Sequence, residues 1–323
     1  MIISKTPFRI SFCGGGTDIQ DYYKHGYGAV VSSAIDKHVY IAIHKFFESE
    51  YVLKYSQTET CKHISDIKHP LIRECLKISN TTDYLEVSSF ADIPAKGSGL
   101  GSSSAFSVGL IKALHAQKGK MLSAEECAEG ACEVEINRLG EPIGKQDQYA
   151  AAFGGLNYMK FNSNGTVNIE PIILIPELHS HLNSNLVMFY TGVTRSASAI
   201  LGEQKKISST KDYLQRMTAI RDHADNLRYM LMHGNIDAVG HLMHENWMLK
   251  KQMDGVSNPT FDAIYQRGLK AGAIGGKILG AGGGGFFLFY ATDAAKLVDE
   301  LGDLRHVPFN MESQGTNVIY YQH

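Results

Sequence analysis

The spacing of apolar residues along the chain follows two different periods. Alternation with a period of two and short unbroken apolar runs, both typical of strands, mark the segments 2–12, 28–46, 51–55, 84–90, 186–192, 277–291 and 316–321. A period near 3.6, typical of helices, marks the segments 102–117, 123–138, 145–153, 196–207, 212–233, 235–253 and 259–271. Because strands and helices mix without a regular βαβ alternation, the pattern predicts an α+β architecture.

The length of the chain, 323 residues, favours two domains, since a domain usually holds about 100–200 residues. The stretch 160–185 is polar and contains Pro171 and Pro176, which interrupt regular structure. We therefore predict an N-terminal domain over residues 1–175 and a C-terminal domain over residues 176–323.

The composition is that of a globular protein, with 44% hydrophobic and 20% charged residues. A formal net charge of −2 provides no general attraction to nucleic acid or to an anionic membrane. No apolar run approaches the ~20 residues that span a bilayer, and the first residues lack the features of a secretory signal. The five cysteines form no CxxC pair, so they suggest neither a disulfide framework nor a zinc site. We expect a cytoplasmic protein that binds neither nucleic acid nor membranes.

Glycines gather in three segments that lie far apart in the sequence: 14–16, 97–101 and 275–285. Glycine lets the backbone approach a ligand closely and adopt a positive φ. Three such segments suggest one ligand that is surrounded by backbone.

The segment 94–114, PAKGSGLGSSSAFSVGLIKAL, leads from a glycine loop directly into the start of a predicted helix. The serines at 102–104 stand where the N-cap belongs, so free backbone amides and the positive end of the helix dipole converge there. Such a site suits phosphate, and a hydroxyl in the first helical turn could ligate the Mg²⁺ that accompanies a nucleotide.

Two other phosphate motifs are excluded. The sequence GEPIGKQ at 140–146 has too few residues between its glycines for a P-loop and lacks the hydroxyl that follows the lysine. The glycines of GSGLGS at 97–102 do not have the spacing of the Rossmann fingerprint.

The three glycine segments together resemble the motifs of the GHMP kinases, the family of galactokinase, homoserine kinase, mevalonate kinase and phosphomevalonate kinase. TPFRISFCGGGTD at 6–18, the loop before the helix at 102–117, and GGKILGAGGGGFFLF at 275–289 follow the family's order. The resemblance implies the two-domain GHMP kinase fold, in which an N-terminal domain like the second domain of ribosomal protein S5 is followed by a ferredoxin-like C-terminal domain. ATP would bind between them.

The resemblance also implies which residues bind the nucleotide and its metal. The ATP phosphates would contact Gly97, Gly99, Leu100, Gly101, Ser102, Ser103 and Ser104. Ser103 matches the family's Mg²⁺-binding serine and Glu135 its metal-binding glutamate, with Glu133 as the substitute candidate.

Two residues are expected to carry the phosphoryl transfer. Asp147 matches the family's catalytic aspartate, and it would orient the attacking hydroxyl and accept its proton. Arg9 lies at the position that sugar-1-kinases of the family use. It would hold Asp147 ionised and stabilise the charge that develops during transfer.

The expected sugar site departs from that of the galactokinases, which carry Glu-His where this chain has Gly15 and Gly16. The loss of two side chains, one of them anionic, opens room for a negative group. This pattern, with TGVTRSAS at 191–198, resembles the family members that act on D-glycero-D-manno-heptose 7-phosphate, and Arg195 would bind the 7-phosphate. The residues expected at the substrate are Gly15, Gly16, Thr17, Asp18, Arg195, Gly282 and Gly283.

We therefore expect ATP-dependent phosphorylation of the C1 hydroxyl of heptose 7-phosphate, which gives the 1,7-bisphosphate that leads to nucleotide-activated heptose. Two alternatives stay open: a kinase of an unphosphorylated sugar such as fucose or galactose, and a catalytically silent sugar-binding homologue. A homodimer also stays open.

Overall fold

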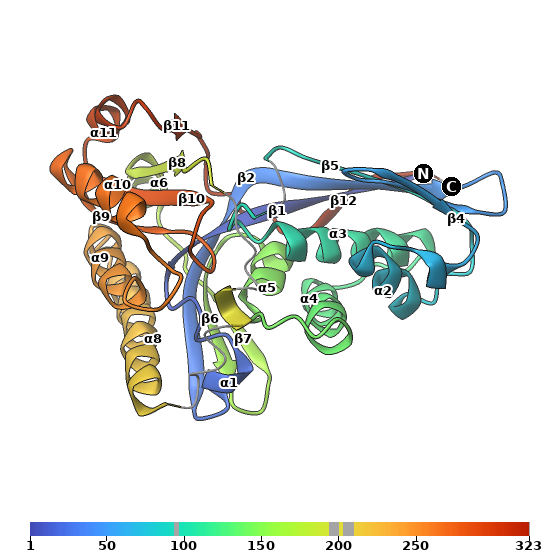
Figure 1. Cartoon of the computed structure of the whole chain (residues 1–323), viewed down its shortest axis with the longest axis horizontal. Helices are drawn as coiled ribbons and strands as arrows, with labels where there is room; N and C mark the ends of the chain where they lie inside the picture. Colours follow the sequence, from blue (N-terminus) through green and yellow to red (C-terminus); the bar gives the residue numbers. More distant parts are fainter. Residues whose placement is uncertain (94–96, 194–199, 203–209, 323) are drawn as a thin grey trace.

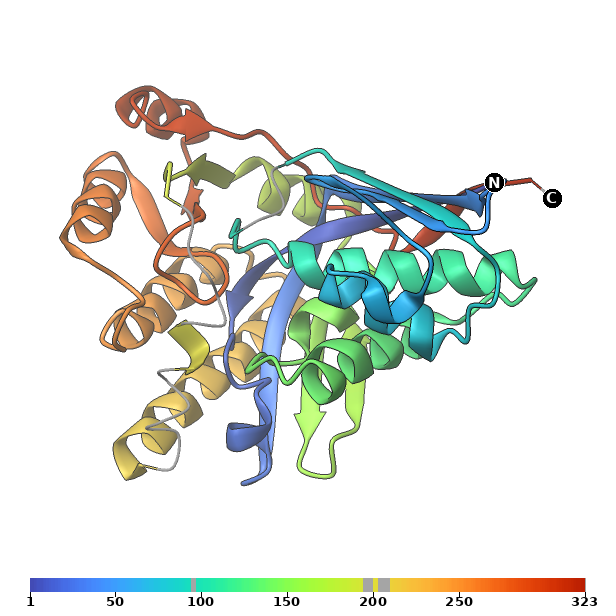
Figure 2. The ribbon, with the colours of Figure 1, turned by 45° about the vertical axis from the view of Figure 1, so that its right-hand side comes forward.

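The computed structural model describes residues 1–93, 97–193, 200–202 and 210–322. The strands of these residues form two sheets, and helices pack against both (Figure 1). The mixture of sheets and helices confirms the predicted α+β class. Figure 2, a view turned by 45°, shows the smaller sheet and its helices beside the larger one.

The larger sheet is organised around one long strand, β2 (Tyr27–Lys45). β1 (Ile2–Cys13) pairs with β2 antiparallel along most of its length. Two strands share the other edge of β2, because β6 (Leu156–Asn162) pairs with its first half and β5 (Leu85–Ala91) with its second half. Within the described residues the sheet is completed by β3 (Tyr51–Lys54), β4 (Thr58–Cys61), β7 (Val167–Pro171) and β12 (Asn317–Tyr321).

A layer of helices covers one face of this sheet and lies beneath it in Figure 1. These helices are α2 (Pro70–Ile78), α3 (Ser102–Gln117), α4 (Ala124–Cys132) and α5 (Gln146–Phe153). α3 is buried along most of its length and packs on β1 and β2. Gly109 permits this close contact, because a Cβ there would lie 2.7 Å from the hydroxyl oxygen of Thr6. Two short helices precede this layer, α1 (Gln20–Tyr23) and the 3-10 turn Ile64–Asp66.

The smaller sheet has the antiparallel order β11-β8-β10-β9. Its strands are β8 (Leu186–Tyr190), β9 (Ala273–Ile278), β10 (Phe286–Ala291) and β11 (Arg305–His306). The helices around it are α6 (Pro176–Ser184), α8 (Lys211–Met232), α9 (Ala238–Lys250), α10 (Pro259–Lys270) and α11 (Ala294–Glu300). α9 contacts both β9 and β1, so its last turn reaches the larger sheet.

Two predicted elements differ from the structure, the first in extent and the second in helix type. The strand predicted over 277–291 is two strands, β9 and β10, which pair with each other across a loop. Gly280, Gly282 and Gly285 in this loop have a positive φ, which no strand residue adopts. The helix predicted over 123–138 is α4 followed by a π-helix at Glu133–Arg138.

The sequence pattern predicts neither α2 nor the β6–β7 hairpin. β7 falls in the polar stretch 160–185, which indicates a connection. The helix predicted over 196–207 lies largely outside the described residues. The division at residue 175 stays a prediction, although β12, from the predicted C-terminal half, pairs with β1. Among the helices of the described ranges, none is both long enough and apolar enough to cross a membrane.

Candidate active site

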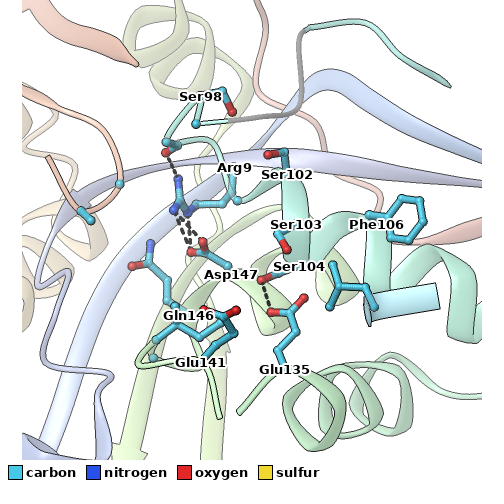
Figure 3. Close-up of a pocket in the computed structure, with 18 of the residues that line it drawn as sticks. Arg9, Ser98, Ser102, Ser103, Ser104, Phe106, Glu135, Glu141, Gln146 and Asp147 are labelled. Atoms are coloured by element: carbon cyan, nitrogen blue, oxygen red, sulfur yellow. Dashed lines mark hydrogen bonds and ion pairs between the residues drawn. The ribbon is translucent and has the colours of Figure 1, made fainter. Parts of the chain in front are cut away.

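A cavity of about 960 Å³ lies between the helical layer and the end of α9. Its walls come from the first glycine segment, the loop before α3, the π-helix, the start of α5 and the last turn of α9. Figure 3 shows Arg9, Ser103, Glu135 and Asp147 around this cavity. The fold therefore brings together residues that the sequence separates by more than a hundred positions.

The loop at 97–104, which we call the glycine-serine loop, ends at the first turn of α3. Gly101 is the N-cap and has a φ of +74°, a left-handed conformation that glycine adopts without strain. Ser103 is exposed and lines the cavity, whereas Ser104 is buried. The backbone amides of the first turn and the positive end of the helix dipole face the same space. This is the geometry of a phosphate site.

The C-terminal glycine segment packs against the glycine-serine loop, backbone on backbone. A Cβ on Gly99 would lie 2.5 Å from the carbonyl oxygen of Leu279, and a Cβ on Gly285 would lie 2.3 Å from that of Ser98. Any side chain at either position would push the two segments apart. These glycines therefore fix the shape of the glycine-serine loop.

Four predicted site residues are not among the residues that line this cavity: Leu100, Thr17, Gly282 and Gly283. The Leu100 carbonyl accepts a hydrogen bond from the Arg9 amide at 3.1 Å, and the Thr17 hydroxyl donates to the carbonyl oxygen of Ala29 at 2.9 Å. The two glycines pack on Val256, whose carbonyl accepts a hydrogen bond from the Gly283 amide. These contacts support the loops of the site, and ligand contact by these four residues stays a prediction.

Arg9 on β1 and Asp147 on α5 form a two-point ion pair beside the glycine-serine loop (Figure 3). The Nε of Arg9 donates to Oδ1 of Asp147 at 2.8 Å, and its Nη2 donates to Oδ2 at 2.9 Å. Nη1 donates to the carbonyl oxygen of Gly99 at 2.6 Å. Arg9 is only 4% exposed, whereas Asp147 is 30% exposed, so a ligand in the cavity can reach the carboxylate. This planar pairing fixes the orientation of Asp147.

Glu135 points into the cavity from the π-helix and is 1% exposed. Its carboxylate accepts hydrogen bonds from the hydroxyls of Ser104 and Ser107 and from Nε2 of Gln148. Burial raises the pKa of Glu135 to about 7, and these hydrogen bonds oppose the rise. A carboxylate offers about four lone-pair positions and three donors occupy three of them, so one position remains for a cation.

The geometry fits a Mg²⁺ site between Ser103 and Glu135. Both residues line the cavity, and carboxylate and hydroxyl oxygens are the hard ligands that Mg²⁺ prefers. Glu133, the substitute candidate, instead pairs with Asn137 and Arg138 on the surface of the π-helix, and it is not part of the cavity lining. Among the two glutamates, the structure therefore favours Glu135.

Asp18 joins the first glycine segment to the start of α5. Its Oδ1 accepts a hydrogen bond from the Gly16 amide at 2.9 Å, and its Oδ2 accepts one from the Gln146 amide at 3.0 Å. Burial raises the pKa of Asp18, and the hydrogen bond from Gln146 is the largest opposing effect. Gly15, Gly16 and Asp18 all line the cavity, as the sequence predicted for the sugar end.

The far end of the cavity is apolar, and its residues were not predicted. Its lining includes Val39, Leu71, Phe90, Ile93 and Phe106. These residues come from separate strands and helices and share no motif, so no local signal in the sequence could identify them. An apolar wall next to a phosphate site suits a flat base such as adenine.

Two buried lysines near the sugar end were also missed. Lys250 on α9 lines the cavity, and Lys277 on β9 lies behind it, with its Nζ 3.1 Å from the hydroxyl of Ser11. In the sequence both appear as ordinary lysines on a helix or strand. Arg195, predicted as the clamp for the distal phosphate, lies outside the described residues.

Comparison with known proteins gives one consistent result. Residues 69–155 match the model of the GHMP kinases N terminal domain, and residues 227–304 match that of the GHMP kinases C terminal domain. The chain is 31% identical over 308 residues to a D-glycero-alpha-D-manno-heptose 7-phosphate kinase of Campylobacter jejuni, an alignment that covers 91% of each chain.

Two other relatives carry different names. A bifunctional fucokinase/GDP-fucose pyrophosphorylase of Arabidopsis thaliana is 29% identical over 90% of this chain and 30% of its own length. A solved structure described as a D-glycero-D-manno-heptose 1-phosphate kinase of Bacteroides thetaiotaomicron matches with a TM-score of 0.82 and 26% identity, and the match covers 100% of both chains.

Proposed function

The chain belongs to the GHMP kinase family, and from this premise we propose that it transfers the γ-phosphoryl group of ATP to the C1 hydroxyl of D-glycero-D-manno-heptose 7-phosphate. The observation that carries the proposal is the Arg9–Asp147 pair, which lies between the glycine-serine loop and Asp18. A phosphate site, a positioned carboxylate and a polar pocket thus meet in one cavity.

The glycine-serine loop binds the phosphates of ATP through the amides of the first turn of α3. Backbone donors suit this task because they are already oriented and need no rearrangement when charge develops. The apolar wall around Phe106 receives the adenine ring. The γ-phosphate is thereby directed toward Asp147, since a Cβ on Gly101 would lie only 3.3 Å from Oδ2 of that residue.

Asp147 orients the sugar hydroxyl and accepts its proton. The hydroxyl oxygen forms a bond to the γ-phosphorus while the bond between that phosphorus and the bridging oxygen breaks, and ADP leaves. The proton passes to the carboxylate of Asp147. Arg9 holds this carboxylate in place and stabilises the charge on the transferring group.

Ser103 and Glu135 would hold a Mg²⁺ ion. Mg²⁺ bound there supplies positive charge to the phosphates of the nucleotide. The hydrogen bonds from Ser104 and Ser107 fix the orientation of the Glu135 carboxylate, so this ligand is already in place before the nucleotide arrives.

The choice of heptose 7-phosphate is supported by the absence of side chains at Gly15 and Gly16, which line the cavity, and by the Campylobacter jejuni relative. The test is a phosphoryl-transfer assay of the purified chain with ATP, Mg²⁺ and a panel of heptose 7-phosphate, heptose 1-phosphate, free heptose, fucose and galactose. We expect the highest kcat/KM for heptose 7-phosphate. Mass and NMR analysis of the product should locate phosphate at both C1 and C7.

A second candidate, a kinase of an unphosphorylated sugar, is favoured by the match to the plant fucokinase. Equal or higher kcat/KM for fucose or another free sugar would overturn the heptose phosphate assignment in its favour. If heptose 1-phosphate is the only sugar phosphorylated, the transfer would take place at another hydroxyl than C1, which would overturn the assignment. No ADP formation with any member of the panel would support the catalytically silent homologue.

A further inference from the structure

Lys250 carries a buried ammonium group. It lies at the end of α9, is 7% exposed, and lines the cavity. Its Nζ donates one hydrogen bond, to the carbonyl oxygen of Gly15 at 2.8 Å. No ion pair joins Lys250 to any acidic residue in the part of the chain that the structure describes. A buried charge of this kind is costly unless a ligand of opposite charge pairs with it.

The nearby carboxylates are committed to other partners. Asp147 is held by Arg9, and both oxygens of Asp18 accept backbone amides. Lys277 lies near Lys250, and burial and the neighbouring Lys250 lower the pKa of Lys277 to about 7, so Lys277 carries only part of a positive charge at neutral pH. Both carboxylates therefore have partners other than Lys250, whose ammonium can pair with an anion.

A second donor near Lys250 also lacks a partner. Gln146 is 5% exposed, and its Nε2 has no hydrogen-bond partner among the described residues. The side chains of Gln146 and Lys250 approach the same backbone position, because a Cβ on Gly15 would lie 3.6 Å from Oε1 of Gln146 and 3.3 Å from Nζ of Lys250. A buried ammonium and the carbonyl oxygen of a buried side-chain amide therefore border the position that a Gly15 side chain would occupy, and the Nε2 of the same amide remains as a donor for a ligand.

We propose that Lys250, with the side-chain amide of Gln146, binds the phosphate group that the sugar substrate already carries. The ATP phosphates have a separate binding surface, the amides of the glycine-serine loop. The Nζ of Lys250 lies instead at the first glycine segment, where it donates to the carbonyl oxygen of Gly15 at 2.8 Å. This inference rests on the proposed function, in that it requires a phosphorylated sugar as substrate.

The test compares kcat/KM for heptose 7-phosphate and for free heptose in Lys250→Gln and Lys250→Met. Hydrogen bonds to charged groups contribute ~1.5–3 kcal/mol, so we expect the preference for the phosphorylated sugar to fall by roughly 10–150-fold in both variants. The side chain of Lys250→Gln can still donate to the Gly15 carbonyl. This variant therefore distinguishes the effect of the lost charge from the effect of a lost structural hydrogen bond. Gln146→Leu should reduce the same preference by a smaller factor.

Lys251→Met is the matched control, because Lys251 is the next residue along the chain and lies 3.4 Å from Asp262, a residue outside the cavity lining. It should keep the wild-type preference. Melting curves and ATP affinity should match the wild type in every variant that is compared.

Three outcomes would overturn the inference. An undiminished preference in Lys250→Gln would assign the residue to the Gly15 loop alone. An equal loss for both sugars would assign it to the transferred phosphoryl group. Loss of the preference in Arg195→Ala with its retention in Lys250→Met would place the phosphate clamp at Arg195. If the wild-type chain prefers a free sugar, the proposed function itself fails, and that result is read before any variant is made.

Discussion

The glycine-serine loop and the first glycine segment, residues 14–16, line the same cavity but differ in what their glycines provide. In the glycine-serine loop, Gly101 turns the backbone so that amides face the ligand, and Gly99 allows another backbone to support it. At Gly15 the missing side chain lets Lys250 and Gln146 lie close to the backbone, since a Cβ there would be 3.3 Å from Nζ of Lys250 and 3.6 Å from Oε1 of Gln146. In the proposed function, glycine therefore serves main-chain recognition in one region and side-chain recognition, by residues from other elements, in the other.

The difference matters for how each region tolerates change. A backbone site fails when its shape is disturbed, whatever the charge of the new side chain. At Gly15, beside the Lys250 ammonium, the charge of a new side chain and its size should have separate effects on substrate binding. Substitutions can therefore separate the two kinds of recognition, and the largest effect is expected where both regions meet, at Asp147.

Asp147→Asn should lower kcat by about 10²–10⁴-fold, because the amide keeps the size of the carboxylate but cannot accept the proton. ATP affinity should change little, since the amides of the glycine-serine loop are untouched. Steady-state kinetics and calorimetry with ATP measure the two quantities. Turnover like that of the wild type would remove Asp147 from the mechanism.

Gly101→Val should weaken ATP binding by about 100-fold. Its Cβ would lie 3.3 Å from atoms of both Arg9 and Asp147, and the φ of +74° is unfavourable for a branched residue. Gly119→Val is the matched control, because its φ is +73° and no atom lies within 4 Å of its Cβ. Calorimetry with a non-hydrolysable ATP analogue should separate the two variants, and equal affinities would place the nucleotide elsewhere.

Glu135→Ala should raise the Mg²⁺ concentration for half-maximal rate by about 10–100-fold, since it removes an oxygen ligand. Glu133→Ala removes a carboxylate from the surface of the same π-helix and should leave the Mg²⁺ dependence unchanged. Titration of the initial rate with Mg²⁺ checks both. The opposite pattern would shift the metal ligand by two residues.

Gly15→Glu should reduce the preference for the sugar phosphate by about 10-fold, because the new side chain would start with a Cβ 3.3 Å from Nζ of Lys250, and its carboxylate would compete for this ammonium and repel the phosphate. Gly15→Gln has the same size without the charge, so it measures the steric part alone. Competition between heptose 7-phosphate and free heptose gives the ratio. Identical ratios in both variants would show that Gly15 provides space only.

The smallest effect is expected from pH. Burial lowers the pKa of Lys250 to about 8, while Asp18 opposes the shift and Arg9 adds to it. Lys250 is charged below that pH and loses its proton above it, so KM for the sugar phosphate should rise by up to about 10-fold between pH 7 and pH 9. The phosphate is already a dianion in this range. KM for a free sugar serves as the control, and a KM that falls with rising pH would contradict the assignment.

Local chemistry made much of the site predictable. The glycine-serine loop, Arg9 and Asp18 lie in motifs whose residue types and spacing indicate their task. Lys250 and the apolar wall were missed because their role depends on tertiary contacts: a lysine at the end of a helix becomes a buried cation only when α9 packs against β1. The prediction of one strand over 277–291 was wrong for a related reason. Its two ends are apolar and indicate a strand, whereas the turn depends on the glycines between them.

The π-helix at Glu133–Arg138 has a consequence for the spacing of the chain. Each residue added to an α-helix rotates the following side chains by about 100°, and a π-helix inserts such a rotation within an otherwise continuous helix. The direction in which the Glu135 side chain points from the helix axis therefore depends on the number of residues between the capping residue Ser123 and this segment. A deletion of one residue there would turn the carboxylate away from Ser104 and Ser107, whereas the loops at the surface can change length without rotating anything in the cavity.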